Sequence, residues 1–179
     1  MKFFATVAIL AIAATAASAT AHTCEECQAD VDQLATYLAA PDKVALVVAL
    51  VQAGPCQDLP DVAQCEADTA AYWGGLITAL ADDPNFQGIV CGEGIGDCKA
   101  ARMADCAECT GFIGEIAGLS SNDDLVAKLL AYLSAEGCSS DGCVRYVNED
   151  MPVILPEILN TMNNEGNPER ICQGCFELC

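Results

Sequence analysis

Apolar residues recur at steps of three and four along most of the chain, which is the spacing of one face of an α-helix. In residues 24–39 this face holds Cys27, Val31, Leu34 and Leu38. The same kind of reading predicts helices over 42–53, 61–81, 84–91, 106–119, 121–137, 142–150, 153–163 and 169–179. No segment alternates apolar and polar residues between hairpin turns, so the pattern predicts an all-α protein.

The first 21 residues have a different pattern. Met1-Lys2 is a short basic start, residues 3–17 are apolar, and small residues then form two Ala-x-Ala sites ending at Ala19 and Ala21. This order predicts a cleaved signal peptide over 1–21, with an uncleaved membrane anchor as the alternative. Because no later stretch reaches the ~18 unbroken apolar residues of a spanning helix, we expect a soluble, secreted mature chain.

Composition excludes several classes of function. The 179 residues include 26 Asp and Glu against 7 Lys and Arg, a net charge of −19, which excludes a nucleic-acid binder. A hydrophobic share of 53% excludes an acidic disordered chain. His22 is the only histidine, so no catalytic triad, histidine base or histidine-containing metal site can form. We therefore expect no enzyme activity, no cofactor and no metal.

Thirteen cysteines divide the chain into two similar halves. In each half the first three cysteines are separated by 3 and 29 residues, and a later pair is separated by 7. The central spacing differs, at 9 residues in the first half and 5 in the second. We interpret the chain as two copies of one module, over 22–99 and 103–179. The linker that contains Lys99 and Arg102 is either cut or an uncut hinge.

The paired cysteines themselves have two interpretations. Cys-x2-Cys occurs in redox and zinc sites, but thioredoxin-like chemistry needs a βαβ context that is absent here. A secreted chain oxidises such thiols, so structural disulfides are the expected state. Six cysteines in a module allow 15 connectivities on sequence alone.

The order of these features resembles the saposin-like family (saposin B-type modules), in two tandem copies that cover the mature chain. It consists of Cys-x2-Cys, a long helical gap, two central cysteines, another gap and a closing pair. The resemblance implies modules of four to five short amphipathic helices, each with three nested disulfides. Those pairs would be Cys24–Cys98, Cys27–Cys91, Cys56–Cys65, Cys106–Cys179, Cys109–Cys172 and Cys138–Cys143. The short loop between Cys138 and Cys143 departs from the family pattern.

The resemblance also implies a function. Saposin-like proteins bind lipids or membranes, commonly in an acidic lysosomal or endosomal lumen, and some present sphingolipids to hydrolases. The implied partners are thus lipids, a membrane surface and a lipid hydrolase. Two alternatives stay open: a pore-forming protein of the amoebapore type, and a self-associating structural protein with no lipid ligand.

Apolar helix faces are the candidate lipid-contact surfaces. Residues 44–51 are apolar on every side of their helix. A helix needs only one apolar stripe to cover a core, so the remaining apolar surface contacts either lipid or a partner subunit. The alternative is a helix that is buried within the module. Trp73 suits either a membrane interface or a core, and Gly74-Gly75 beside it suits a hinge. The predicted lipid-contact residues are Val44, Leu46, Val47, Val48, Leu50, Val51, Trp73, Leu76, Ile77, Leu80, Leu125, Leu129, Leu130, Leu133, Ile154, Leu155, Ile158 and Leu159.

Charge and the odd cysteine add two expectations. Without Lys2 the mature chain has 26 acids and 6 bases, which gives −20. Because Asp and Glu titrate near pH 4, we expect each module to open or dimerise around acyl chains more readily in acid. Cys175 has no counterpart in the first half, so it either forms an intermolecular disulfide in a homodimer or is a buried free thiol.

Overall fold

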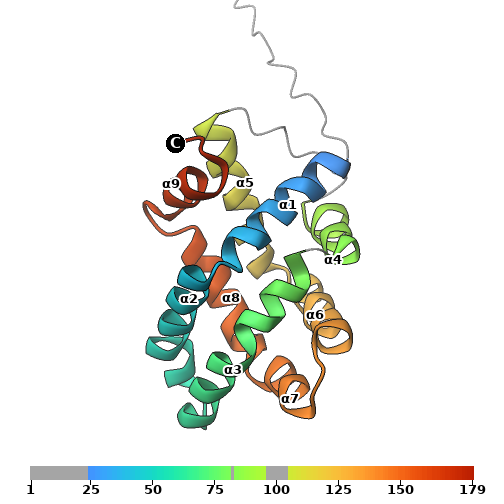
Figure 1. The fold of residues 1–179 in the computed structure, drawn as a ribbon, viewed down its shortest axis with the longest axis vertical. Helices are drawn as coiled ribbons and strands as arrows, with labels where there is room; N and C mark the ends of the chain where they lie inside the picture. Colours follow the sequence, from blue (N-terminus) through green and yellow to red (C-terminus); the bar gives the residue numbers. More distant parts are fainter. Residues whose placement is uncertain (1–23, 82, 96–104) are drawn as a thin grey trace, which may run out of the picture.

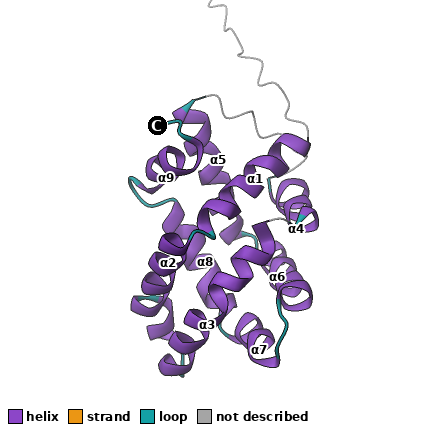
Figure 2. Ribbon diagram, viewed as in Figure 1, coloured by secondary structure: helices purple, strands orange, loops and turns teal. Residues whose placement is uncertain are grey.

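The structure is a computed structural model that describes residues 24–81, 83–95 and 105–179. All regular secondary structure in these ranges is helical, and they contain no strand (Figure 2). The prediction of an all-α protein is therefore confirmed. The predicted signal peptide and the linker around Lys99 and Arg102 lie outside the described residues.

The first half consists of four α-helices and two short turns of other helix types (Figure 1). They are α1 (Cys24–Leu38), α2 (Pro41–Ala53), η1 (Pro55–Asp58), α3 (Val62–Ala81), α4 (Pro84–Gly88) and η2 (Ile89–Gly94). Pro41 lies in the first turn of α2, where its missing N–H costs no hydrogen bond. Helix α3 is continuous through Gly74 and Gly75, so the glycine pair does not break the helix.

The second half repeats this order with one helix divided. Its elements are α5 (Cys106–Gly118), η3 (Leu119–Ser121), α6 (Asp123–Tyr132), η4 (Leu133–Gly137), α7 (Asp141–Glu149), α8 (Met151–Met162), α9 (Asn167–Ile171) and η5 (Cys172–Phe176). The place of the long α3 is taken by α7 and α8, which meet at Asp150. Pro152 explains the break, because proline lacks an N–H for the helical ladder and is best tolerated in the first turn of a helix.

Polar side chains fix where the second-half helices begin. The carboxylate of Asp105 accepts from the backbone N–H of Glu108 at the start of α5. Asn122 and Ser140 do the same for α6 and α7. Such caps satisfy backbone donors that a helix start leaves open, and each contributes about 1 kcal/mol.

Among the described residues, five disulfides hold the helices together, and each lies within one half. They are Cys27–Cys91, Cys56–Cys65, Cys106–Cys179, Cys109–Cys172 and Cys138–Cys143. These are the pairs that the saposin-like resemblance implies for these ten cysteines. The sixth expected pair, Cys24–Cys98, lies outside the described residues because Cys98 does.

The hydrophobic core is shared between the halves. One cluster of buried residues contains both Cys27–Cys91 and Cys109–Cys172, so it is built from α1 and η2 together with α5 and η5. A second cluster contains Cys56–Cys65 together with Cys143, at the other end of the molecule. The sequence predicts that each module opens or dimerises by its own apolar face. In the structure those faces pack against each other within one chain. A short linker favours this packing because it raises the effective concentration of one half around the other.

Polar contacts also join the halves. Arg145 of α7 donates to Asp68 of α3, and Tyr132 of α6 donates to Asp83. Lys128 pairs with Glu93 at a more exposed position. At the opposite end the Gln33 side chain donates to the backbone oxygen of Cys175, with 2.6 Å between Nε2 and O.

No single helix in the described ranges is long and apolar enough to cross a bilayer. By length and composition alone, one bent pair, Glu25–Leu38 with Pro41–Asp58, meets that criterion, and its two parts are inclined by 76°.

Candidate functional site: an apolar cavity between the two halves

A cavity of about 690 Å³ lies where the apolar faces of the two halves meet. Its walls come mainly from α1, α2 and α3 of the first half and from α5, α6, α8 and α9 of the second. Small-molecule sites in proteins usually have volumes of about 300–1,000 Å³. The cavity therefore has the size of a ligand site rather than of a packing defect.

Most of the predicted lipid-contact residues line this cavity. Those that do are Leu46, Val47, Leu50, Val51, Trp73, Leu76, Ile77, Leu80, Leu129, Leu133, Leu155, Ile158 and Leu159. The other five lie outside the cavity lining. Leu125, Leu130 and Ile154 are buried in the shared core, and Val44 and Val48 are half-buried and pack against it. The pattern of apolar positions identifies apolar faces, but it does not say which side chains fill the core and which border an open space.

Several lining residues are absent from the sequence prediction. They come from α1, from α4 and η2, and from the second half: Val31, Leu34, Leu38, Phe86, Val90, Ile116, Leu119, Met151, Met162 and Ile171. The α1 face of Val31, Leu34 and Leu38 is visible in the sequence as a helical stripe, which is typical of a module core. Only the approach of the second half turns this stripe into a cavity wall.

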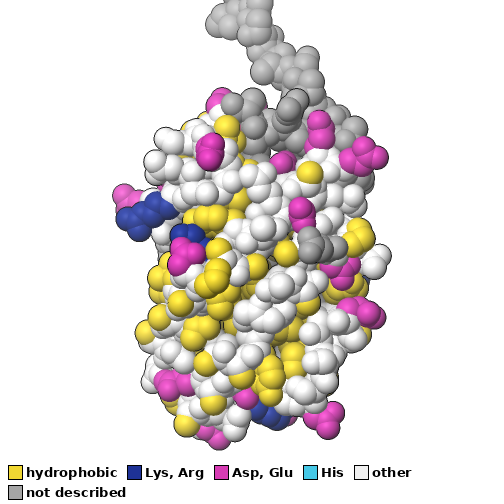
Figure 3. Space-filling model, in the orientation of Figure 1, with side chains coloured by type: hydrophobic (Ala, Val, Ile, Leu, Met, Phe, Trp, Pro, Cys, Tyr) yellow, Lys and Arg dark blue, Asp and Glu magenta, His cyan; other side chains and the backbone are white. Residues whose placement is uncertain are grey.

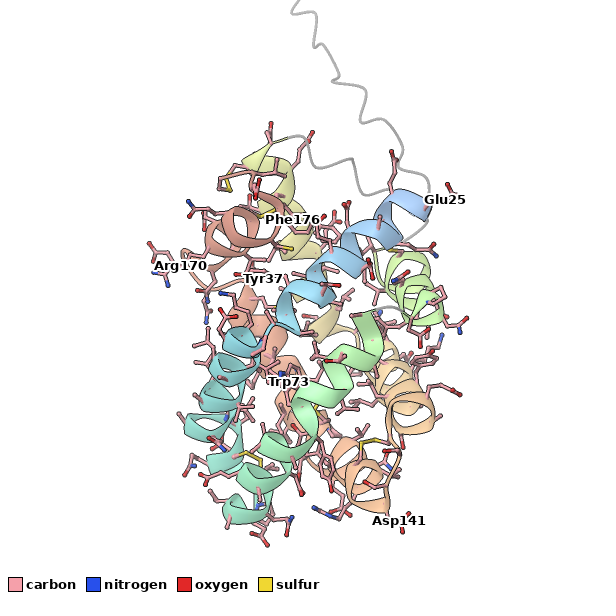
Figure 4. The ribbon with its side chains drawn as sticks, in the orientation of Figure 1. Glu25, Tyr37, Trp73, Asp141, Arg170 and Phe176 are labelled. Carbon is pink, nitrogen blue, oxygen red and sulfur yellow. A yellow bond between two sulfur atoms is a disulfide. The ribbon has the colours of Figure 1, made fainter. Side chains whose placement is uncertain are left out.

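Among the deeply buried residues of the cavity wall, Trp73 is the one whose side chain carries a hydrogen-bond donor (Figure 4). It is 3% exposed, and its indole Nε1 has no hydrogen-bond acceptor among the described residues. Sequence analysis leaves Trp73 open between an interfacial and a core position, and the structure places it in the cavity wall. Since buried donors are nearly always paired, this N–H is a position where a ligand oxygen or a water would be stabilised.

The cavity reaches the protein surface beside α2. We call the exposed end of the lining the mouth; its residues are Tyr37, Lys43, Leu46, Leu50, Glu157 and Arg170. Leu46 and Leu50, one helical turn apart, are 56% and 46% exposed, although both are large apolar residues. Figure 3 shows basic side chains at the border of a hydrophobic surface in this region, and Figure 4 shows Arg170 on the same side of the molecule as Tyr37.

Interactions at the mouth hold Lys43 in place. Its ammonium lies 3.0 Å from the carboxylate of Asp42 and 5.0 Å from the centre of the Tyr37 ring. The hydrogen bond from Lys43 lowers the pKa of Asp42, and the same bond raises the pKa of Lys43. Lys43 is therefore charged over the whole physiological pH range.

Buried ionisable groups lie near the other end of the molecule, outside the cavity lining. Burial raises the pKa of Asp150, whose Oδ2 has no hydrogen-bond partner among the described residues. Burial also raises the pKa of Tyr146 to about 12. Within the described ranges, no group of three or more His, Cys, Asp or Glu side chains is arranged to hold a metal ion.

Cys175 is half-buried at the contact between the halves. Its thiol donates to the backbone oxygen of Gln33, with 3.5 Å between Sγ and O, and burial raises its pKa to about 12. This environment favours a packed, protonated thiol, one of the two alternatives that the sequence leaves open. The intermolecular disulfide stays a prediction.

Comparison with known proteins adds no relative: no family model, no curated protein and no solved structure matches this chain. The cavity and its mouth are therefore interpreted from their own chemistry.

Proposed function

We propose that this protein binds lipids and shelters an acyl chain in the cavity between its two halves. The observation that carries the proposal is an apolar space of about 690 Å³, walled by both halves and open at a mouth where Leu46 and Leu50 are exposed. The saposin-like pattern of the cysteines supports the same function. In this proposal one chain closes on the ligand by itself, because the second half occupies the position that another copy would take.

The energetics of burial favour a hydrocarbon ligand. Each CH₂ group removed from water contributes about 0.8 kcal/mol, so about ten such groups contribute about 8 kcal/mol. Lost translational freedom and chain ordering offset part of this gain. We therefore expect stable binding only for hydrocarbon chains of about ten carbons or more.

The five disulfides indicate an oxidising compartment. We propose that the protein acts after secretion or in a lysosomal or endosomal lumen, as a carrier or as an activator that presents lipid to a hydrolase. A chain with a net charge of −19 is repelled by anionic membranes at neutral pH. Protonation of its carboxylates in acid weakens that repulsion, so uptake from membranes should be faster at pH 4.5 than at pH 7.5.

The test is extraction of lipid from vesicles by variants whose cavity is filled. Leu155→Phe and Ile77→Phe each place a larger side chain at a half-buried cavity wall, and both should reduce the amount of lipid recovered with the protein. Val153→Phe is the matched control, because Val153 lies on the same helix as Leu155 but is 39% exposed and outside the lining. Equal lipid recovery from all four proteins would contradict the proposal.

Dye release from the same vesicles separates the carrier from the pore former. The carrier should extract lipid while the vesicles stay intact. Dye release at low protein dose without recovery of bound lipid would instead support the pore-forming alternative. If the protein neither extracts lipid nor releases dye, the structural alternative without a lipid ligand is favoured.

A further inference from the structure

The basic side chains of this acidic protein are unevenly distributed. The described ranges contain four Lys and Arg residues. Lys128 and Arg145 pair with acidic residues of the opposite half and so belong to the contact between the halves. The other two, Lys43 and Arg170, both line the mouth of the cavity.

Of the two cations at the mouth, Arg170 has the fewer acidic partners. Within the described part of the chain no carboxylate lies within ion-pair distance of its guanidinium, and its side chain is exposed. Lys43 has one carboxylate partner among the described residues, the adjacent Asp42, whose side chain is 71% exposed. Since exposed pairs of this kind contribute about 1 kcal/mol or less, Lys43 can exchange Asp42 for a ligand at little cost.

We propose that the mouth binds the anionic head of the amphiphile whose hydrocarbon chain occupies the cavity. This inference rests on the proposed function and adds the chemical class of the ligand: one chain with a carboxylate or phosphate head. Arg170 offers a planar fork that matches either anion with two hydrogen bonds, and Lys43 adds a second positive charge. In this proposal the hydrocarbon chain lies against the exposed Leu46 and Leu50 where it enters the cavity.

The charge balance at the mouth supports this assignment. Lys43 and Arg170 face one carboxylate in the lining, Glu157, so the lining carries a net charge of +1 in a chain of −19. With Asp42, which lies beside Lys43 outside the lining, the local charge falls to zero, still far less negative than the chain as a whole. An anionic head is therefore repelled by most of the surface but not by the mouth, where the exposed Arg170 can bind it, and this difference orients the ligand with its chain toward the cavity.

The test compares two ligands that differ only in their heads. Decanoate and decanol are titrated at pH 7.4 into the full mature chain and into Lys43→Ala/Arg170→Ala, with calorimetry as the readout. The double variant should bind decanoate about tenfold more weakly, as expected for the loss of hydrogen bonds to a charged group. Its affinity for decanol should be unchanged. Lys128→Ala, which removes a cation that is not part of the lining, should change neither affinity.

Each other outcome has a definite meaning. If the double variant loses the same factor for both ligands, the two residues only shape the mouth, and the proposal of head recognition is overturned. If the unaltered protein binds decanol but decanoate affinity does not depend on the two cations, the proposal also fails while the proposed function stands. If neither ligand binds, the proposed function itself fails.

Inorganic phosphate distinguishes a lipid head from a free anion. Phosphate alone lacks the hydrocarbon chain, so it should bind weakly and should not displace decanoate at equal concentration. Displacement at equal concentration would show that the mouth is a site for free anions, and it would overturn the assignment of an amphiphile.

Discussion

Arg145 on α7 donates a hydrogen bond to the carboxylate of Asp68 on α3, and this ion pair joins the two disulfide-closed halves. The carboxylate is the more deeply buried partner, with a side chain that is 8% exposed against 34% for Arg145. Its other oxygen accepts from Gln64 at 2.9 Å. The pair lies beside the second core cluster, which contains the next two residues of α7, Tyr146 and Val147, and it is not part of the cavity lining.

Arg145→Met should destabilise the protein by about 1–3 kcal/mol, because Asp68 is then left buried without its cation. Urea unfolding followed by circular dichroism measures this change. Lys128→Ala is the control: it removes an ion pair between the halves whose partners are 58% and 50% exposed, and should cost at most about 1 kcal/mol. Equal effects of the two substitutions would contradict the importance of the buried pair.

Asp150→Asn should make the protein more stable at pH 7.5. Burial raises the pKa of Asp150 in the folded state above its ordinary value of 3.8, so the ionised carboxylate is disfavoured there. The folded state binds this proton more tightly than the unfolded state, and the penalty is relieved as pH falls from above the raised pKa toward 3.8. The gain from the substitution should therefore shrink between pH 7.5 and pH 4. Urea unfolding at several pH values tests this, and a gain that grows in acid would show the opposite sign.

The thiol of Cys175 should react slowly with iodoacetamide at pH 8. Its pKa of about 12 leaves about one thiolate in ten thousand, and its Sγ donates to Gln33. Labelling in urea should be faster by orders of magnitude, since unfolding restores an ordinary thiol. Rapid labelling of the folded protein, or a dimer that disappears on reduction, would contradict a packed thiol and support the intermolecular disulfide.

Removal of different disulfides should have unequal effects. Cys27–Cys91 joins residues 64 apart, whereas Cys138–Cys143 joins residues 5 apart. Loop-closure entropy then gives about 4 kcal/mol for the first bond and about 2 kcal/mol for the second. Thermal unfolding of the two double Cys→Ser variants measures the difference. A larger loss from the short loop would mean that packing around Cys143, and not the restriction of the unfolded chain, dominates.

The sequence is sufficient to predict the helices, because their apolar stripes and end signals are local. Pro41, Pro84 and Asp123 lie in the first turns of α2, α4 and α6. The break at Asp150 also follows from local chemistry, since Pro152 stands after it. Spacing of the cysteines indicates the repeat, and the resemblance built on it implies the five bonds that the structure contains.

The sequence does not predict how the two halves pack on each other. Leu76 and Leu155 are separated by 79 positions, and only tertiary packing places both in the wall of one cavity. The same holds for Lys43 and Arg170, which have no motif in common and meet at the mouth. Two similar apolar faces can pair within one chain or between two chains. No local pattern in the sequence therefore predicts that the two halves of one chain pack on each other.

The position of Trp73 allows the most direct test of an acyl chain in the cavity. It is the only tryptophan of the chain, it is 3% exposed, and it lines the cavity wall. Fluorescence of the mature protein should be measured with stearic acid and with stearic acid brominated at mid-chain, since bromine quenches tryptophan only at short range. We predict saturable quenching by the brominated chain alone, and its loss in Leu155→Phe but not in Val153→Phe. Binding of the brominated acid without any quenching of Trp73 would place the chain elsewhere and contradict the account.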